Sequence, residues 1–426
     1  MSGVLFYNKS RIKTNVLTNM VIKEADEKDV NFYDYDGFRL LSYTNAEALT
    51  LTSLPKNPVV NKNLTFNGWN WSLANIKSHI NNVGGVVNVG AVYYTTDDKT
   101  HIIFKPTEYN KTARICLTPT DANDVIVDWG DGSTSTWTGT SEETKTHTYT
   151  NVNDKSVYDI AISCTTGTYS FPTYITESQE NNSSSCYVGV NLSRKVTELT
   201  EQCFSECRSI KFISVPNNIS ISYNSFYGCR SLEHLTLPNS VTEIPSGCFY
   251  LDHSLKTVSI PDNAESFGVS CFASCYSLQS ITIPSGFDSF GQSCFSLCYS
   301  LQFITIPNSV TSLGDQCFYN CNSLQYINLP NNANFTSLGN NCFTNCYSLP
   351  SLTIPSSVTS IGSPCITGYC LSKLYIKSTT PPTLSSTGSI SGSSNLVIYV
   401  PTGTLSTYQN ANNWSNFSSK MKEYNF

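Results

Sequence analysis

Cys294–Gly314 reads CFSLCYSLQFITIPNSVTSLG, and the same pattern begins again at Cys317. Its phenylalanine recurs along the chain at intervals of 22, 23, 23, 23, 23 and 25 residues. The positions are Phe204, Phe226, Phe249, Phe272, Phe295, Phe318 and Phe343. Self-similarity at a fixed period of this length indicates a stack of structural repeats, in which each copy contacts its neighbours.

A second pattern, L-x-x-L-x-L, keeps the same period as the phenylalanines. Its copies begin at Leu232, Leu255, Leu278, Leu301, Leu324 and Leu349, with degenerate copies at Ile210 and Leu371. Two registers locked together over seven copies indicate leucine-rich repeats. Each copy predicts one short strand whose apolar side chains point inward, and the proline that follows it ends the strand because proline cannot donate to a ladder.

Cysteine is the other recurring residue, with seventeen in the chain. Five C-x-x-x-C pairs fall at the same place in successive repeats: Cys203/Cys207, Cys271/Cys275, Cys294/Cys298, Cys317/Cys321 and Cys342/Cys346. Zinc sites more often combine C-x2-C pairs, so a column of small buried side chains is favoured. Disulfides and a metal site stay open as alternatives. Many free thiols would indicate assembly in a reducing compartment.

The repeat motif C-F-x-x-C-x-S-L-x-x-I-x-I-P-x-S-V-x-x-[IL]-G resembles the BspA-like repeats. These occur in surface proteins of gut and oral bacteria, in some protists and in phages of gut bacteria. The stretch Leu396–Phe426 resembles the closing cap of such arrays. The resemblance implies a solenoid over residues 186–400 and a C-terminal cap over 401–426. It also implies a role in adhesion or binding, with no common ligand.

The middle of the chain resembles a PKD-like β-sandwich, expected over residues 108–170. Val127–Gly132 reads VDWGDG, and His147–Tyr149 and Val157–Ile160 follow as HTY and VYDI. In that family Gly-Asp-Gly makes the tight turn after a strand. Asp128 and Asp131 either hold this turn through their side chains or bind calcium. The turn is favoured because no third carboxylate is clustered with them.

Two motifs near the N-terminus, YDGFRL at Tyr35–Leu40 and LTFNGWNWSL at Leu64–Leu73, resemble a module of phage virion and prophage-encoded proteins. We expect an anchoring arm over residues 1–62, with a charge cluster at Glu24–Asp29, and a small mixed α/β module over 63–107. Apolar residues at helical spacing predict a short helix within residues 72–80. Trp69 and Trp71 are interpreted as packing residues, with ligand stacking as the alternative.

The strand-forming repeats and the sandwich motifs predict a protein that is mainly β.

Composition and motifs exclude several classes of function. Its net charge of -6 argues against binding nucleic acid, which requires clustered Lys and Arg. No apolar run is long enough for a membrane span, and the N-terminus lacks a secretory signal pattern. The five histidines fit no catalytic or metal motif. We therefore expect no enzyme activity, cofactor or metal site.

A ligand face is the remaining candidate site. The outward positions of the L-x-x-L-x-L strands form columns, and a separate stripe of tyrosines follows the cysteine column. The candidate residues are Tyr276, Tyr299, Tyr347, Gln279, Gln302, Gln325, Phe303 and Tyr326. Thr236, Thr282, Thr305 and Thr353 are expected to share a further outward column. The columns either stack and hydrogen-bond sugar rings or form a solvated ladder whose members contact one another.

These patterns and resemblances favour a non-enzymatic virion protein, such as a head fibre or decoration protein. The resemblance to proteins of gut phages implies the crAss-like phages as its source. Its arm would attach to capsid or other virion proteins, and its repeats would contact host-surface glycan. We expect a dimer or trimer, assembled in the host cytoplasm and located in the virion. The alternative is a bacterial cell-surface adhesin of the BspA-like type.

Overall fold

The structure is a computed structural model. It describes residues 29–57, 63–121, 124–150, 152–153, 156–172 and 186–426, and the backbone of 12–15 and 20–23. The protein is mainly β, as predicted, with 9% helix, 33% strand and a β-solenoid of about 11 turns in its C-terminal region. It divides into two compact units. Unit 1 comprises Met1–Lys77, Val86–Val241 and Thr257–Asp262, and unit 2 comprises Ser78–Gly85, Thr242–Lys256 and Asn263–Phe426.

The first part of unit 1 is a four-stranded sheet of order β4-β3-β6-β5. Its strands are β3 (Val30–Tyr33), β4 (Arg39–Tyr43), β5 (Leu64–Trp69) and β6 (Val87–Thr95). Because β3 pairs with β6, the boundary expected at residue 62 runs through this sheet. A hairpin of β1 (Ile12–Asn15) and β2 (Met20–Lys23) precedes it. The rest of the expected arm before Asp29, most of the charge cluster included, lies outside the described residues.

Two helices accompany this sheet. α1 (Asn45–Thr50) begins with a capping box, in which Thr44 and Glu47 satisfy each other's backbone N–H groups. α2 (Leu73–Asn82) confirms the helix predicted within residues 72–80. The packing interpretation of the two tryptophans is also confirmed, since Trp69 is 6% exposed and Trp71 is 1% exposed.

Residues 100–172 form two sheets of a sandwich. One contains β10 (Thr134–Thr136), β9 (Val125–Asp128), β12 (Tyr158–Cys164) and β7 (Thr100–Phe104). The other contains β11 (Glu143–Thr148), β8 (Thr112–Pro119) and β13 (Tyr169–Phe171). Buried aromatic rings lie between them, where Phe104 stacks on Tyr149 with centroids 5.5 Å apart. The sandwich thus begins at β7, inside the segment expected to be a separate module.

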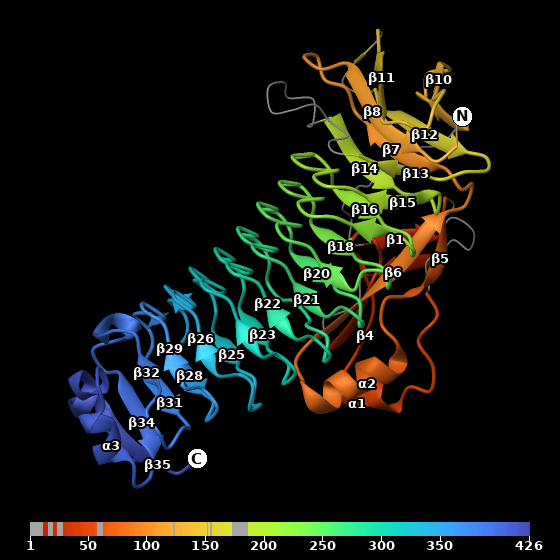
Figure 1. Cartoon of the computed structure of the whole chain (residues 1–426). Coiled ribbons are helices and arrows are strands. Elements are labelled where there is room, and N and C mark those ends of the chain that lie inside the picture. The colour runs from red at the N-terminus through yellow and green to blue at the C-terminus, as the bar shows by residue number, and fades with distance from the viewer. Residues whose placement is uncertain are drawn as a thin grey trace. The chain divides into compact units, whose positions relative to one another are not determined.

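Each sheet of the sandwich continues directly into the repeats (Figure 1). β7 pairs with β14 (Tyr187–Asn191), which pairs in parallel with β16 (Phe212–Ser214). In the other sheet β13 pairs with β15 (Val196–Leu199), which pairs with β17 (Ser220–Ile221). The hydroxyl of Tyr187 joins the two sheets, donating to the carbonyl of Arg114 at 2.7 Å and accepting from its N–H at 2.8 Å. The sandwich therefore caps the first repeats.

The N-terminal sheet packs on the outward side of the next repeat strands, β18 (His234–Thr236) and β20 (Thr257–Ser259). The Asn70 side chain donates to the carbonyls of Leu237 and Ser259 at 3.1 and 3.0 Å. Trp71 donates through Nε1 to the carbonyl of Ile260 at 2.6 Å. Contact is close enough that a Cβ on Gly90 would lie 2.3 Å from Oγ1 of Thr236. These strands are therefore covered.

Unit 2 contains the later repeats, whose short strands stack in parallel ladders (Figure 1). One ladder is β19 (Glu243–Ile244), β21 (Ser266–Phe267), β22 (Ser289–Phe290), β24 (Ser312–Leu313), β26 (Ser337–Leu338), β29 (Ser360–Ile361) and β32 (Thr383–Leu384). The L-x-x-L-x-L strands are β23 (Phe303–Thr305), β25 (Tyr326–Asn328), β28 (Ser351–Ile354), β31 (Lys373–Ile376) and β34 (Val397–Pro401). β27 (Phe343–Thr344), β30 (Ile366–Thr367) and β33 (Ile390–Ser391) form a third ladder.

The last turns of unit 2 close the stack. β35 (Met421–Tyr424) pairs with β34, and between them lie α3 (Leu405–Asn410) and the 3-10 helix Trp414–Lys420. A further 3-10 turn, Thr387–Ser389, precedes β33. Trp414 is buried and donates to the carbonyl of Pro382 at 2.6 Å, so it anchors the segment to the preceding repeat.

The core of the repeats is a column of parallel phenylalanine rings. In unit 2 the rings from Phe249 to Phe343 follow one another with centroids 5.1 to 5.6 Å apart and planes within 6°. All are 0–1% exposed. The repeat cysteines flank this column. All seventeen cysteines of the chain are buried except Cys370, and none takes part in a disulfide. The packing interpretation of the repeat cysteines is confirmed.

Each turn around the cysteines also contains residues with left-handed backbone. Leu251 and Leu297 have φ of +67° and +63°, and Asn320 and Asn345 occupy the equivalent place two residues after the phenylalanine with +58° and +62°. Side chains other than glycine and asparagine rarely adopt this conformation. The stacked turns therefore impose it on leucine in two repeats.

Candidate binding surface

The strand face of unit 2 is defined here as the outward side of the L-x-x-L-x-L strands around β23 and β25. Phe303 and Tyr326 are register partners and are 51% and 55% exposed. Gln279, Gln302 and Gln325 are exposed beside them. Their main chains are joined, with Gln302 N–H donating to the Gln279 carbonyl and Gln325 N–H to that of Gln302. The strand face thus presents two open rings and a row of amides.

The tyrosine column follows the second cysteine of each repeat. Tyr276 lies between His253, with centroids 4.3 Å apart, and Tyr299, at 5.0 Å. Tyr347 stacks on Tyr369 at 5.6 Å. The column therefore forms a ladder, and both faces of Tyr276 are covered by other rings. His253 and Tyr369 were missed in the sequence, although both stand at the same repeat position as the tyrosines.

The expected outward threonine column is wrong for its first two members. Thr236 is 4% exposed and Thr282 is 2% exposed, whereas Thr353 is exposed. The N-terminal sheet covers Thr236 through Gly90. Residues far apart in sequence bury this position, so the repeat pattern alone could not predict it.

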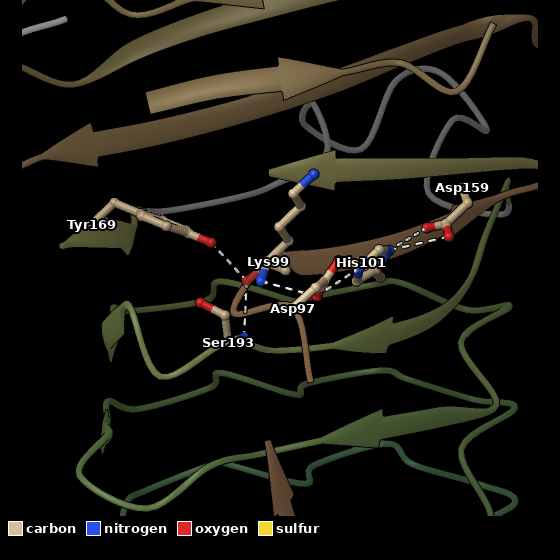
Figure 2. A network of polar contacts seen from close by, with 7 residues as sticks. Asp97, Lys99, His101, Asp159, Tyr169 and Ser193 are labelled. Carbon is tan, nitrogen blue, oxygen red and sulfur yellow. Dashed lines mark hydrogen bonds and ion pairs between the residues drawn. The ribbon is translucent and has the colours of Figure 1, made fainter. Parts of the chain in front are cut away.

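A polar network in the sandwich is centred on His101 (Figure 2). Its Nδ1 lies 2.9 Å from Asp159 and its Nε2 lies 3.0 Å from Asp97. Burial alone would lower the pKa of His101, but hydrogen bonds and charge from the two carboxylates raise it above its ordinary value. Beside it, Tyr169 donates to the Thr100 hydroxyl at 2.7 Å. Because both ring nitrogens are engaged by carboxylates, His101 is placed to join strands and not to act as a base.

The turn after β9 is held by its own aspartates. Asp128 accepts from the N–H of Gly130 at 2.9 Å, and Asp131 accepts from the N–H of Ser133 at 3.0 Å. Asp131 also lies 2.7 Å from Nε2 of His147, a pair that sequence reasoning missed. Burial would raise the pKa of Asp131, but these hydrogen bonds and the histidine lower it. This is the arrangement that the turn interpretation predicts.

Within the part of the chain that the structure describes, no group of three or more His, Cys, Asp or Glu side chains is arranged to hold a metal ion. No described helix is both long and apolar enough to cross a membrane.

Comparison with known families concerns the repeats. Residues 181–302 and 266–386 match the family described as the BspA type leucine rich repeat region, in six copies. This part of the chain is a BspA-type leucine-rich repeat region. The matched family is a repeat region and not an enzyme family. Comparison with curated proteins finds no significant match.

The solved structures with similar repeats include proteins of three bacteria. A leucine-rich repeat protein of Bacteroides ovatus is 21% identical over 54% of this chain and 63% of its own, with a TM-score of 0.38. The T. pallidum leucine rich repeat protein is 24% identical over 44% of this chain and 78% of its own, with a TM-score of 0.32. A leucine rich cell surface protein of Faecalibacterium prausnitzii is 18% identical over 62% and 87%, with a TM-score of 0.29.

Proposed function

We propose that this chain is a non-enzymatic structural and binding protein, a head-fibre or decoration component of a phage virion that contacts host-surface glycan. The N-terminal arm attaches it to capsid or other virion proteins. The BspA-type repeats display the binding surface, and the chains associate as a dimer or trimer.

The observation that carries the binding role is the strand face of unit 2. Phe303 and Tyr326 are more than half exposed, although their neighbours Ile304 and Ile327 are 2% and 6% exposed. Aromatic rings offer a flat apolar face, and amides both donate and accept hydrogen bonds. A sugar presents C–H groups on one face and hydroxyls around its edge, so this combination suits a glycan.

The virion setting is supported by the cysteines and by the upstream resemblances. The repeat thiols fill the core as reduced side chains, which suits a protein that folds in a reducing cytoplasm, where phage particles are assembled. The N-terminal motifs resemble a module of phage virion and prophage-encoded surface proteins, in which it precedes PKD-like and BspA-like parts as it does here. In the alternative interpretation, Asp128 and Asp131 bind calcium in the PKD-like turn. The proposed virion role does not depend on such a calcium ion.

A glycan array tests the binding role. We expect the protein to bind a subset of host-surface glycans and the double variant Phe303→Ala/Tyr326→Ala to lose that binding. Tyr109→Ala is the matched control, because Tyr109 is 94% exposed and lies in unit 1. Binding that survives in the double variant would remove the strand face from the proposal.

Deletion of residues 1–28 tests attachment. The deletion stops before Asp29, whose carbonyl accepts from the N–H of Val87, and before Val30, which is fully buried. We expect a folded protein that no longer co-sediments with particles and whose oligomer is lost in light scattering. Normal incorporation of the truncated protein would place the anchor elsewhere.

The alternative is a bacterial surface adhesin, which the BspA-type match supports equally. Mass spectrometry separates the two. The virion proposal predicts the chain in purified particles, whereas the adhesin predicts its peptides among those released by protease from intact bacterial cells.

A further inference from the structure

The tyrosine column is interrupted at one repeat. Tyr276, Tyr299, Tyr347 and Tyr369 directly follow the second cysteine position, and Asn322 takes this place between Tyr299 and Tyr347. Strands stack ~4.8 Å apart, so Tyr299 and Tyr347 are separated by roughly 10 Å. A ring placed midway would lie about 5 Å from each tyrosine ring. This separation falls within the 4.5–7 Å that is typical of stacked aromatic centroids. Tyr276 and Tyr299 themselves stack at 5.0 Å.

The Asn322 side chain is directed to the turn backbone. In the amide orientation that satisfies its surroundings, its nitrogen donates to the carbonyls of Asn320 and Asn345 at 3.2 and 3.0 Å. Tyr299 and Tyr347 are each 37% exposed. Each stacks on a ring on one side only, Tyr299 on Tyr276 and Tyr347 on Tyr369. The order of the column therefore leads us to expect their remaining faces on the two sides of residue 322.

The surroundings of the interruption are polar and uncharged. The turn segments 296–301, 319–324 and 344–349 contain no Asp, Glu, Lys, Arg or His. Ser300, Ser323 and Ser348 follow the three column positions and are half-buried or exposed. A ligand ring here meets two aromatic faces, hydroxyls and amides, and no charge. These groups match a neutral ring with polar substituents better than an ion or a purely apolar side chain.

We propose that the interruption at Asn322 binds one neutral pyranose unit of a glycan, held between the facing rings of Tyr299 and Tyr347. The C–H groups of the sugar ring pack on the two tyrosine faces, and its hydroxyls are met by the adjacent serines. The inference rests on glycan binding as the proposed function, and it uses none of the residues of the strand face.

Two substitutions at residue 322 distinguish this site from a merely solvated turn. Asn322→Tyr restores the ring that other repeats carry and fills the position, whereas Asn322→Ala leaves it open. Tyrosine occurs naturally at the equivalent place in the neighbouring repeats, so we expect both variants to fold. Circular dichroism and thermal unfolding of the full chain check this directly.

The measurement is NMR of protein with ¹³C-labelled tyrosine rings. The probes are the methyl glycosides of glucose, galactose, mannose and N-acetylglucosamine, with p-cresol as an aromatic probe. Tyr299→Phe and Tyr347→Phe assign the two signals. We expect at least one glycoside to shift both signals, Asn322→Tyr to weaken its binding about tenfold or more, and Asn322→Ala to change it by less than about threefold.

The inference is overturned if no glycoside shifts either ring signal, if p-cresol alone does so, or if Asn322→Tyr binds like the wild type. Its failure differs from failure of the proposed function. Array binding that is lost in Phe303→Ala/Tyr326→Ala but unchanged in Asn322→Tyr would leave the strand face standing and remove only this site. If the wild-type protein bound no glycan at all, both the site at Asn322 and the proposed glycan-binding function would be contradicted.

Discussion

Sγ of Cys298 donates a hydrogen bond to the backbone carbonyl of Phe272, 3.2 Å away and one repeat earlier. Cys275, Cys321 and Cys346 make the same contact to the phenylalanine of the repeat before them. The second cysteine of the pair therefore fills the core and also ties adjacent turns together. Serine or alanine at this position would not supply both functions.

Thiol labelling should distinguish one cysteine from the rest. Burial raises the pKa of Cys298 well above its ordinary value, and the thiolate is the reactive form. Cys370 is the exposed member of the seventeen. We expect one thiol to react quickly with a disulfide reagent in the native protein and all seventeen to react in denaturant. Cys370→Ser should abolish the fast reaction, and missing thiols in denaturant would reveal disulfides.

Phe295→Ala should destabilise the repeats strongly. Phe295 is fully buried between Phe272 and Phe318, with centroids 5.4 and 5.5 Å away. Emptying a packed aromatic site costs about 3–5 kcal/mol of unfolding free energy. The matched control is Phe303→Ala in the same repeat, where the side chain is 51% exposed. Equal losses for the two variants in urea unfolding would contradict this packing.

Leu297→Asn should stabilise the protein. Leu297 has φ of +63°, whereas the equivalent places in the next two repeats are Asn320 and Asn345. A left-handed conformation costs a residue such as leucine roughly 1–2 kcal/mol, and asparagine adopts it more readily. We expect a gain of about 1 kcal/mol in unfolding free energy and a loss of similar size for Asn320→Leu. A destabilised Leu297→Asn would show that the leucine side chain contributes more than its backbone strain costs.

His101 should make stability depend on pH. Its pKa is raised in the folded protein above the ordinary 6.5, so the folded state holds the proton more tightly than the unfolded chain. This contribution is complete below the unfolded-state pKa and is lost as pH rises through the folded-state pKa. The difference in unfolding free energy between wild type and His101→Gln should therefore shrink as pH rises above about 6.5. Asp97→Asn should reduce the slope, and a constant difference would contradict the ion pairs.

The sequence was sufficient for everything that follows from the period of the repeats. The phenylalanine column, the buried cysteines and the strand ends are local consequences of one motif repeated in register. Burial of Thr236 could not be predicted, because it depends on Gly90, more than a hundred residues away. The left-handed backbone of Leu297 could not be predicted for a different reason. Neighbouring turns impose this conformation against the preference of leucine itself.

The residues of the candidate surface could be predicted from the sequence. Which of their rings stack on one another and which are exposed could not. Strand spacing brings Tyr276 and Tyr299 close enough to stack on each other, whereas Phe303 and Tyr326 are more than half exposed. The interruption at Asn322 is visible in the sequence, but its meaning depends on where the amide lies.

The joining of the sandwich to the repeats has a consequence for how such proteins change in length. β14 and β15 begin the two walls of the solenoid already paired to sandwich strands, so the first repeat presents no bare edge to another chain. Repeats interact only with their neighbours, so copies can be gained or lost downstream while this starting template is untouched. Unequal recombination between the repeat segments would then yield longer or shorter solenoids that all begin to fold from the same place.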